Sequence, residues 1–204
     1  MSEIELLQPN TVSIAVLIIL AYLVGSISFS LLMARIFSLG NLRNIGSGNI
    51  GTTNVLRTGN YLAAALTLIL DLAKGFLPVL AAWFVTQNPI IVQVVGLACF
   101  FGHLWPIWHQ FRGGKGVATF FGVIFAATPL AGIVVALIWC GVAGIFRIAS
   151  LASLLSALAY PLVLIILGNF NYLWFAVLAL IFIGLKHRPN IQRIFAGKES
   201  KIKL

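Results

Sequence analysis

The chain has 204 residues, of which 61% are hydrophobic and only 8% are charged, and its mean hydropathy is +1.07. In a soluble domain about a quarter of the residues are charged, and a chain this apolar would lack the polar groups to cover a surface in water. The composition therefore excludes a soluble globular protein, and we expect residues 1–204 to form one membrane domain. The net charge of +9 is expected to mark cytoplasmic loops and contacts with anionic headgroups, not a nucleic-acid site.

The apolar segments predict seven helices, at residues 12–37, 60–86, 89–110, 117–127, 130–146, 149–168 and 171–187. The fourth and fifth come from one apolar run, which we divide at Thr128-Pro129 because proline cannot continue a helix. The short fourth helix could not cross a hydrocarbon core about 30 Å thick, so it should end inside the protein beside buried polar backbone. We therefore expect an all-α integral membrane protein with seven transmembrane helices, at least one of them short.

Basic residues occupy alternate connections. They are Arg43 and Arg57 after the first helix, Arg112 and Lys115 after the third, Arg147 after the fifth, and Lys186, Arg188, Arg193, Lys198, Lys201 and Lys203 at or after the end of the seventh. The other connections carry no Lys or Arg, and the N-terminal segment carries Glu3 and Glu5 instead. The positive-inside rule then predicts that the N-terminus lies outside and the C-terminus in the cytoplasm.

A first polar cluster follows the first helix, at residues 46–60. Its candidate substrate-binding residues are Gly46, Ser47, Gly48, Asn49, Thr53, Asn54 and Arg57. Glycines let backbone N–H groups converge on an anion, hydroxyl and amide side chains add neutral donors, and arginine adds a planar cation suited to phosphate. The same residue types are common in ordinary turns, so the cluster alone leaves a flexible loop open as the alternative.

A second cluster opens the short fourth helix with the candidate binding residues Arg112, Gly113, Gly114, Lys115 and Gly116. Free N–H groups, the positive end of the helix dipole and a lysine lie together there, which favours a bound phosphate. The motif is not a nucleotide-binding P-loop, because Gly116 stands where Ser or Thr should follow the lysine. The alternative is a basic turn that flanks a membrane span.

A third cluster, residues 186–193, begins where the seventh helix ends. It contains Asn190 and His187, a side chain that can move protons or donate to phosphate; the alternative is a juxtamembrane basic stop signal. The predicted topology places the three clusters on one side, together with Ser150 at the start of the sixth helix. We therefore expect a single site for an anionic, phosphate-bearing substrate.

Asp71 and Lys74 are three residues apart in the second helix, so they share a face that must point into the bundle. We interpret them as a structural ion pair or loop anchor rather than as catalytic groups. The remaining acidic residues are Glu3, Glu5 and Glu199, which form no carboxylate cluster for Mg²⁺ or Ca²⁺, and the Cys and His residues lack zinc spacing. We expect no metal and no carboxylate base in the site.

In combination, these motifs resemble the bacterial membrane glycerol-3-phosphate acyltransferases of the PlsY type. The resemblance rests on residues 46–57, 102–119 and 187–191, with 71–75 and 150–153 also similar, in the same order along nearly the whole chain. It implies acyl transfer from a fatty acyl phosphate to the 1-hydroxyl of glycerol 3-phosphate. The products would be lysophosphatidate and inorganic phosphate, the first step of phospholipid synthesis, made without acyl-CoA, metal or cofactor.

The resemblance also implies residue roles and surroundings. The second motif would bind the phosphate of glycerol 3-phosphate, and the other critical residues would be Ser47, Arg57, His187 and Asn190, beside Lys115. The protein would cross the bacterial inner membrane with its active site on the cytoplasmic side, and it would work with a soluble enzyme of the PlsX type that makes the acyl phosphate. The family usually carries Glu where this chain has Pro189; a structural Glu would be dispensable, whereas a Glu that took part in the chemistry would not.

For the chemistry, we expect a substrate phosphate oxygen to accept the proton of the attacking hydroxyl, with His187 as the alternative base. Donors from Ser47, Asn49, Asn190 or the glycine loop would stabilise the charge on the acyl oxygen. Two other functions remain open on the sequence. One is a transporter of a phosphate ester, because broken helices and glycine loops also build transport sites. The other is a non-catalytic protein that binds anionic lipids.

Overall fold

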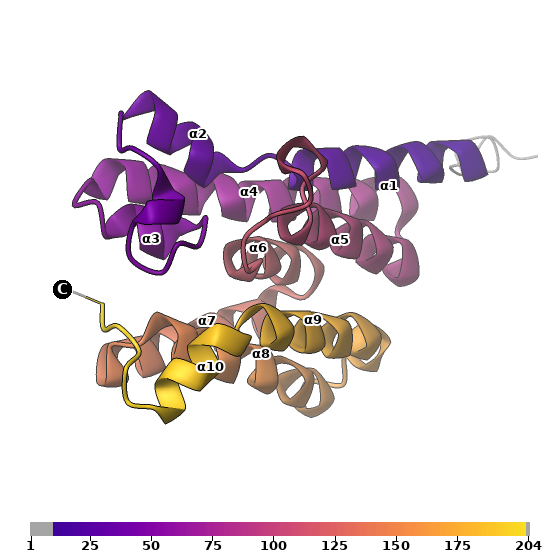
Figure 1. The fold of residues 1–204 in the computed structure, drawn as a ribbon. Helices are drawn as coiled ribbons and strands as arrows, with labels where there is room; N and C mark the ends of the chain where they lie inside the picture. Colours follow the sequence, from indigo (N-terminus) through magenta and orange to yellow (C-terminus); the bar gives the residue numbers. More distant parts are fainter. Residues whose placement is uncertain (1–9, 203–204) are drawn as a thin grey trace, which may run out of the picture.

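The structure, a computed structural model, describes residues 10–202 (Figure 1). In this range the backbone forms α-helices joined by loops and short 3₁₀ turns, without a β-strand. The helices are α1 (Thr11–Gly25), α2 (Phe29–Ile36), α3 (Thr52–Leu56), α4 (Tyr61–Thr86), α5 (Pro89–Leu104), α6 (Val117–Ala127), α7 (Pro129–Phe146), α8 (Ala149–Ile166), α9 (Leu173–Lys186) and α10 (Arg188–Phe195). Glu3, Glu5 and Lys203, which entered the charge argument, lie outside the described residues.

From α4 to α9 the helices follow the predicted segments closely. α6 ends at Ala127 and α7 begins at Pro129, so the predicted division at Thr128-Pro129 is confirmed. α6 has 11 residues, which leaves it as short as expected. The short helices α3 and α10, inside the first and third clusters, were not anticipated by the apolar pattern, because neither is an apolar run.

The first apolar segment differs from its prediction. A single helix over residues 12–37 is wrong, because the chain breaks after Gly25 and resumes as α2 at a bend of 42°. Inside the break, the Ile27 carbonyl accepts a hydrogen bond of 2.7 Å from the Lys74 ammonium of α4. Lys74 also lies 2.7 Å from the Asp71 carboxylate, and both side chains are buried. A membrane helix is interrupted only where other groups satisfy its backbone, so this ion pair occupies the place of a structural anchor.

The helices pack in two layers (Figure 1). α1, α4 and α5 lie in one layer and α7, α8 and α9 in the other, while α6 lies between them and packs against both α4 and α7. α4 and α6 approach closely, since a Cβ at Gly75 would collide with the Thr119 carbonyl and one at Gly122 with the Leu72 carbonyl. Small residues at helix crossings are typical of membrane proteins. They fix α6, and with it the second cluster, against α4.

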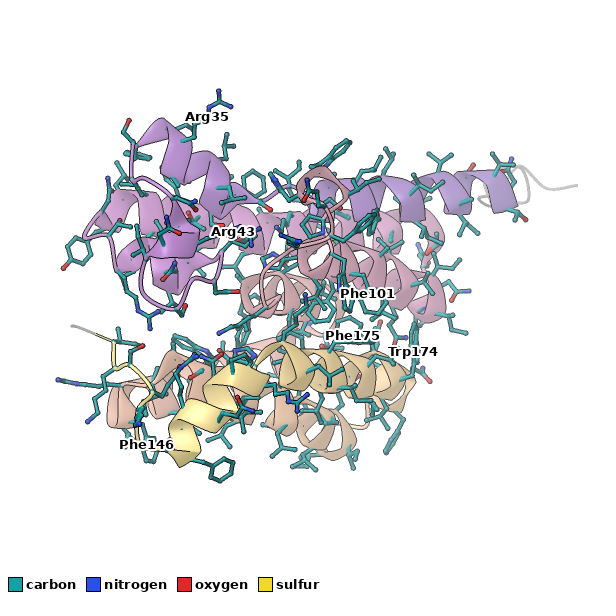
Figure 2. All side chains as sticks on the ribbon, in the orientation of Figure 1. Arg35, Arg43, Phe101, Phe146, Trp174 and Phe175 are labelled. Atoms are coloured by element: carbon teal, nitrogen blue, oxygen red, sulfur yellow. The ribbon has the colours of Figure 1, made fainter. Side chains whose placement is uncertain are left out.

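Aromatic side chains fill the space between the layers. Phe120 of α6, Tyr160 of α8 and Phe175 of α9 pack with ring centroids 5.4 to 6.4 Å apart, and Phe101 packs edge-on against Phe182. Phe101 and Phe175 lie where the two layers meet (Figure 2). The outer helix faces carry exposed apolar side chains, and only 22% of α7 is buried inside the protein. These faces suit contact with lipid rather than water.

Among the described residues, four helices are long and apolar enough to cross a membrane: α4, α5 with its extension to His109, α7 and α8. The number rises to six if α1 with α2, and the segment from Phe170 through α10, each count as one bent span. The fold is therefore all-α with several candidate membrane spans, as expected. The start of α1 and the C-terminal segment lie at opposite ends of the bundle (Figure 1).

Candidate active site

The second cluster forms a tight loop that leads into α6. Gly116 precedes the helix with a φ of 80°, a left-handed conformation that glycine adopts without strain. The N–H groups of the first turn of α6 thus lie beside Lys115, with the positive end of the helix dipole. A Cβ at Gly114 would collide with the His103 ring and come within 2.6 Å of the Ile50 carbonyl oxygen. The loop is therefore held between the end of α5 and the first cluster.

The residues just before this loop are conformationally unusual. Gln110 and Phe111 have φ angles of 53° and 59°, and successive left-handed positions are costly for residues other than glycine. The Phe111 N–H donates to the Pro106 carbonyl at 3.0 Å, which helps to hold this turn. Arg43 donates from Nη2 to the Arg112 carbonyl at 3.1 Å, whereas the Arg112 side chain is exposed. The segment that leads into the first cluster is thus joined to the second cluster, and Arg112 lies at the edge of the loop.

The first cluster folds around the Asn54 side chain, which is buried. Asn54 Oδ1 accepts from the Ser47 N–H at 3.3 Å, and Nδ2 donates to the Leu42 carbonyl at 2.7 Å. Gly46 lies tightly over it, because a Cβ there would come within 2.7 Å of both Asn54 Oδ1 and Arg57 Cδ. Asn54 was predicted as a substrate-binding residue; its burial and its two backbone partners favour a role in shaping the loop.

The other predicted residues of this cluster are more open. Ser47 is exposed, while Gly48, Asn49 and Thr53 are partly buried. Asn49 donates from Nδ2 to the Ile50 carbonyl at 3.4 Å, beside the position where Gly114 meets the first cluster. Asn49 therefore lies at the border of the glycine loop.

The third cluster starts a new helix. Pro189 lies in the first turn of α10, where its missing N–H costs nothing, and it is exposed. Asn190, the next residue, is buried, and its Oδ1 accepts a hydrogen bond of 2.6 Å from the Lys115 ammonium. Residue 189 therefore stands apart from the contact between the second and third clusters.

Glu199 is the residue of this region that the sequence analysis missed. Its Oε1 accepts from Asn190 Nδ2 at 2.6 Å and from the Ser150 hydroxyl at 2.8 Å, and its Oε2 accepts from Arg193 Nε at 2.6 Å. The site therefore contains a carboxylate that was not anticipated, whereas the expectation that no carboxylate acts as the base stays a prediction. The only hint in the sequence is that Glu199 is the one acidic residue after Asp71.

The C-terminal segment connects the clusters further. Ser200 lies within hydrogen-bond distance of the Arg57 guanidinium, and the Ile202 N–H donates to the Arg147 carbonyl at 2.6 Å. Residues from the ends of α3, α6, α7, α8 and α10 thus meet at one end of the bundle. The structure brings together the predicted residues Arg57, Lys115, Ser150 and Asn190, with the Ser47 loop at its border.

The charges of this network are coupled. Burial lowers the pKa of Lys115 to about 8; Glu199 acts against this shift, whereas Arg193 and Arg57 add to it. For Glu199, burial alone would raise the pKa, but the hydrogen bonds from Asn190, Ser150 and Arg193 outweigh it and hold the pKa below its usual value. At neutral pH the network therefore contains a lysine cation and a carboxylate that share Asn190 between them.

His187 lies at the junction of α9 and α10 and is buried. Its Nδ1 is 2.8 Å from the Ile183 carbonyl oxygen, so the proton of the neutral ring resides on Nδ1 and Nε2 is the acceptor. Burial lowers its pKa to about 4, and the Lys115 charge adds to this effect. His187 is thus neutral at physiological pH and a weak base.

A second polar group lies deeper, behind the glycine loop. The His103 ring contacts Thr119 of α6 at 3.1 Å, and its Nδ1 is 3.8 Å from the Asp71 carboxylate. This group links α4, α5 and α6 and supports the loop from within the bundle. Over residues 10–202, the side chains of His, Cys, Asp and Glu form no group of three or more that could hold a metal ion.

Comparison with known proteins extends over nearly the whole chain. A family model described as glycerol-3-phosphate acyltransferase matches residues 15–197. A glycerol-3-phosphate acyltransferase of Jannaschia sp. (strain CCS1) is 45% identical over 199 residues, which cover 98% of each chain. One of Agrobacterium fabrum (strain C58 / ATCC 33970) is 44% identical over 205 residues, which cover 99% of this chain and 98% of the relative.

Two solved structures are similar as well. Both are crystal structures of PlsY, an integral membrane glycerol 3-phosphate acyltransferase. The glycerol 3-phosphate form has a TM-score of 0.88 and 38% identity over 94% of this chain and 96% of that chain. The lysophosphatidic acid form has a TM-score of 0.84 and 36% identity over 93% of this chain and 95% of that chain.

Proposed function

Because the chain belongs to the PlsY family of glycerol-3-phosphate acyltransferases, we propose that it moves a fatty acyl group from an acyl phosphate to the 1-hydroxyl of glycerol 3-phosphate. The products are lysophosphatidate and inorganic phosphate, so the reaction begins phospholipid synthesis. The observation that carries the proposal is the hydrogen bond between Lys115, at the start of α6, and Asn190 of α10. It belongs to a site where a cation and the free N–H groups of a helix face the same end of the bundle, as a phosphate requires.

Glycerol 3-phosphate binds with its phosphate at the start of α6. The N–H groups after Gly116 and the Lys115 ammonium donate to the phosphate oxygens, and Gly113 and Gly114 keep the loop narrow enough to expose them. Arg57 and Arg112 reduce the repulsion between two anionic substrates. Holding both substrates in one orientation removes several kcal/mol from the barrier.

In the transfer itself, the 1-hydroxyl oxygen forms a bond to the acyl carbon, and the bond from that carbon to the phosphate oxygen breaks. Negative charge develops on the acyl oxygen between these two events. Ser47, Asn49 and the N–H groups of the glycine loop are the donors that stabilise it. Phosphate leaves readily, so the leaving group needs no acid.

The proton of the hydroxyl passes to a phosphate oxygen of a substrate. This assignment is supported by the weakness of the two side chains that compete with it. His187, with a pKa of about 4, is a poor base at neutral pH. Glu199 already accepts three hydrogen bonds, and its pKa lies below the usual value. The reaction therefore needs no carboxylate base.

The site faces the cytoplasm of a bacterial inner membrane in this proposal, and the chain forms seven membrane helices, among them the short α6, with the N-terminus outside. Two observations support the topology: the start of α1 and the C-terminal segment lie at opposite ends of the bundle, and the site cations share the C-terminal end. A soluble enzyme of the PlsX type supplies the acyl phosphate at this side, and direct contact would protect the reactive anhydride from water.

A transporter of phosphate esters is the alternative function. Transport sites lie near the middle of the membrane between repeated halves, whereas these clusters gather at the helix ends. Uptake of labelled glycerol 3-phosphate into liposomes without acyl donor separates the two functions, because an acyltransferase gives no uptake.

The direct test uses purified protein in detergent with glycerol 3-phosphate and palmitoyl phosphate, in the presence of EDTA. Phosphate and lysophosphatidate should form in equal amounts, with no reaction from palmitoyl-CoA. The Lys115→Ala variant should be inactive, and Lys198→Ala, which removes an exposed lysine, should be active. A folded wild-type protein that gives no lysophosphatidate from either donor would overturn the proposal.

A further inference from the structure

Glu199 lies at the centre of the site, although it belongs to the irregular segment that follows α10. Its side chain is only 5% exposed. The three groups that donate to it lie on two helices, Ser150 at the start of α8 and Asn190 with Arg193 in α10. A carboxylate in a site for two anionic substrates is electrostatically unfavourable unless it organises the groups that bind them.

The Asn190 amide has only one orientation that satisfies both neighbours. Its Nδ2 donates to Glu199 at 2.6 Å, which leaves Oδ1 to accept from Lys115 at 2.6 Å. The reversed amide would set its NH₂ group against the Lys115 ammonium and its oxygen against the carboxylate, so both contacts would be repulsive. Glu199 therefore fixes the amide, and the amide fixes the position of the Lys115 ammonium.

The chain end is folded so that Glu199 reaches this point. Gly197 has a φ of 65°, and the Lys198 N–H donates to the Arg193 carbonyl at 2.8 Å, which turns the chain back after α10. Ser200 then contacts Arg57, and Ile202 contacts Arg147. The segment 197–202 thus spans from the first cluster to the α7–α8 turn, with Glu199 in its middle.

We propose that Glu199 is a positioning residue of the acyl-transfer site, which orients Asn190 and through it the Lys115 ammonium that binds the phosphate of glycerol 3-phosphate. The inference rests on the proposed function. Glu199 acts through its neighbours and does not contact the substrate. It lies beyond residues 15–197, the part that the family model matches.

The charge of Glu199 also has a measurable consequence at Lys115. The charged groups that face Lys115 are Glu199, Arg193 and Arg57, and the neutral His187 lies close by. Of the three charges, Glu199 alone favours the protonated lysine. Its removal lowers the pH at which Lys115 loses its proton, so the fall of kcat/KM at alkaline pH should begin earlier.

The test compares Glu199→Gln and Glu199→Asp with wild type and with Lys198→Gln, an exposed neighbouring charge. In Glu199→Gln, kcat/KM for glycerol 3-phosphate should fall by roughly ten- to a hundredfold, the effect of losing a hydrogen bond to a charged group. KM for glycerol 3-phosphate should rise while KM for acyl phosphate stays within about twofold, a split that a loss of folded protein would not produce. The alkaline limb of the pH profile should shift below the wild-type value.

Glu199→Asp keeps the charge, so its alkaline limb should remain at the wild-type pH while KM takes an intermediate value. This variant also decides the question if Glu199→Gln does not fold. In an Asn190→Ala background, Glu199→Gln should have no further effect on KM, because the path through the amide is already lost. A wild-type KM and pH profile in Glu199→Gln would overturn the inference alone, whereas an inactive wild-type enzyme would remove the proposed function beneath it.

Discussion

Over residues 10–202, a lysine is linked to a carboxylate at two places, and the two links are built differently. In α4, the Lys74 ammonium contacts the Asp71 carboxylate directly at 2.7 Å and donates a further hydrogen bond to the Ile27 carbonyl. Both charged side chains are buried. At the end of the bundle, Lys115 meets Glu199 only through the Asn190 amide. An ammonium has three protons to donate. The first arrangement commits two of them to the fold, whereas the second commits one, to Asn190, and leaves more for a ligand.

The comparison shows why a directly paired lysine in the membrane is structural. Direct pairing cancels the charge and closes the cluster, and breaking it leaves a buried charge without a partner. An amide between lysine and carboxylate holds the lysine in place while keeping its charge available.

The largest expected effect on activity is at Lys115. Lys115→Ala should lower kcat/KM for glycerol 3-phosphate by roughly 10²- to 10³-fold or more, as loss of a positioned charged donor does. The melting temperature should change little, because the variant removes a single hydrogen bond from the fold, the one to Asn190. A loss of thermal stability as large as that expected for Lys74→Met would instead show that Lys115 has a structural role.

The opposite result is expected at Lys74. Lys74→Met leaves Asp71 buried and unpaired and should destabilise the protein by about 3–5 kcal/mol. Activity per folded molecule, measured at low temperature, should be retained. Combining it with Asp71→Leu should recover most of the stability, since apolar replacements of both partners remove the buried charge. Thermal unfolding in detergent checks both variants, and a stable but inactive Lys74→Met would contradict the structural role.

A feature of the fold can be predicted from the sequence when the residues that determine it are neighbours in the chain, and it is missed when they are far apart. The division of α6 from α7 was predicted because proline acts on its own neighbours. The break between α1 and α2 was missed, because residues 26–28 contain no proline and the break depends on Lys74, 47 residues away from Ile27. Local chemistry marks where a helix must end, but not where a distant side chain allows it to end.

The site shows the same limit. The three clusters were recognised from residue types that suit phosphate. Asn54 was assigned to binding because an amide can donate to phosphate, yet tertiary packing turns it inward to Leu42 and Ser47. Glu199 was missed because its role depends on a chain reversal at Gly197 and on Ser150, 49 residues earlier.

A smaller effect should follow from widening the glycine loop. Gly114→Ala places a methyl group against the His103 ring and the Ile50 carbonyl, which should cost about 1–3 kcal/mol and lower kcat/KM about tenfold or more. Gly141→Ala in α7 is the matched control, because a Cβ there meets nothing within 4 Å. Steady-state kinetics of both variants measure the difference. If Gly114→Ala and Gly141→Ala had the same kcat/KM, activity would not depend on the close packing of the loop at Gly114.

The pH dependence of kcat/KM tests the protonation state of Lys115 in the site. Lys115 must be protonated to bind phosphate, and its pKa of about 8 means that kcat/KM should fall as the pH rises through this value. His187→Gln should leave the shape of the profile unchanged between pH 6 and pH 8, a range that begins roughly two units above the His187 pKa of about 4. A limb lost in His187→Gln would instead identify this residue as the base.

The smallest effect is expected at Pro189. Because this side chain is exposed in the first turn of α10, Pro189→Glu should change stability by no more than about 0.5 kcal/mol and leave kcat/KM within about twofold. Thermal unfolding and the acyl phosphate assay check both values. A large gain in activity would show that a carboxylate at position 189 reaches the reacting groups.

The most direct test of the site is a crystal structure of this protein with glycerol 3-phosphate bound. We predict that the phosphate lies at the start of α6, within hydrogen-bond distance of the Lys115 ammonium and the first N–H groups of the helix, with Asn190 and Glu199 still in contact. A phosphate bound elsewhere, with the Lys115–Asn190 pair intact and the start of α6 empty, would contradict it.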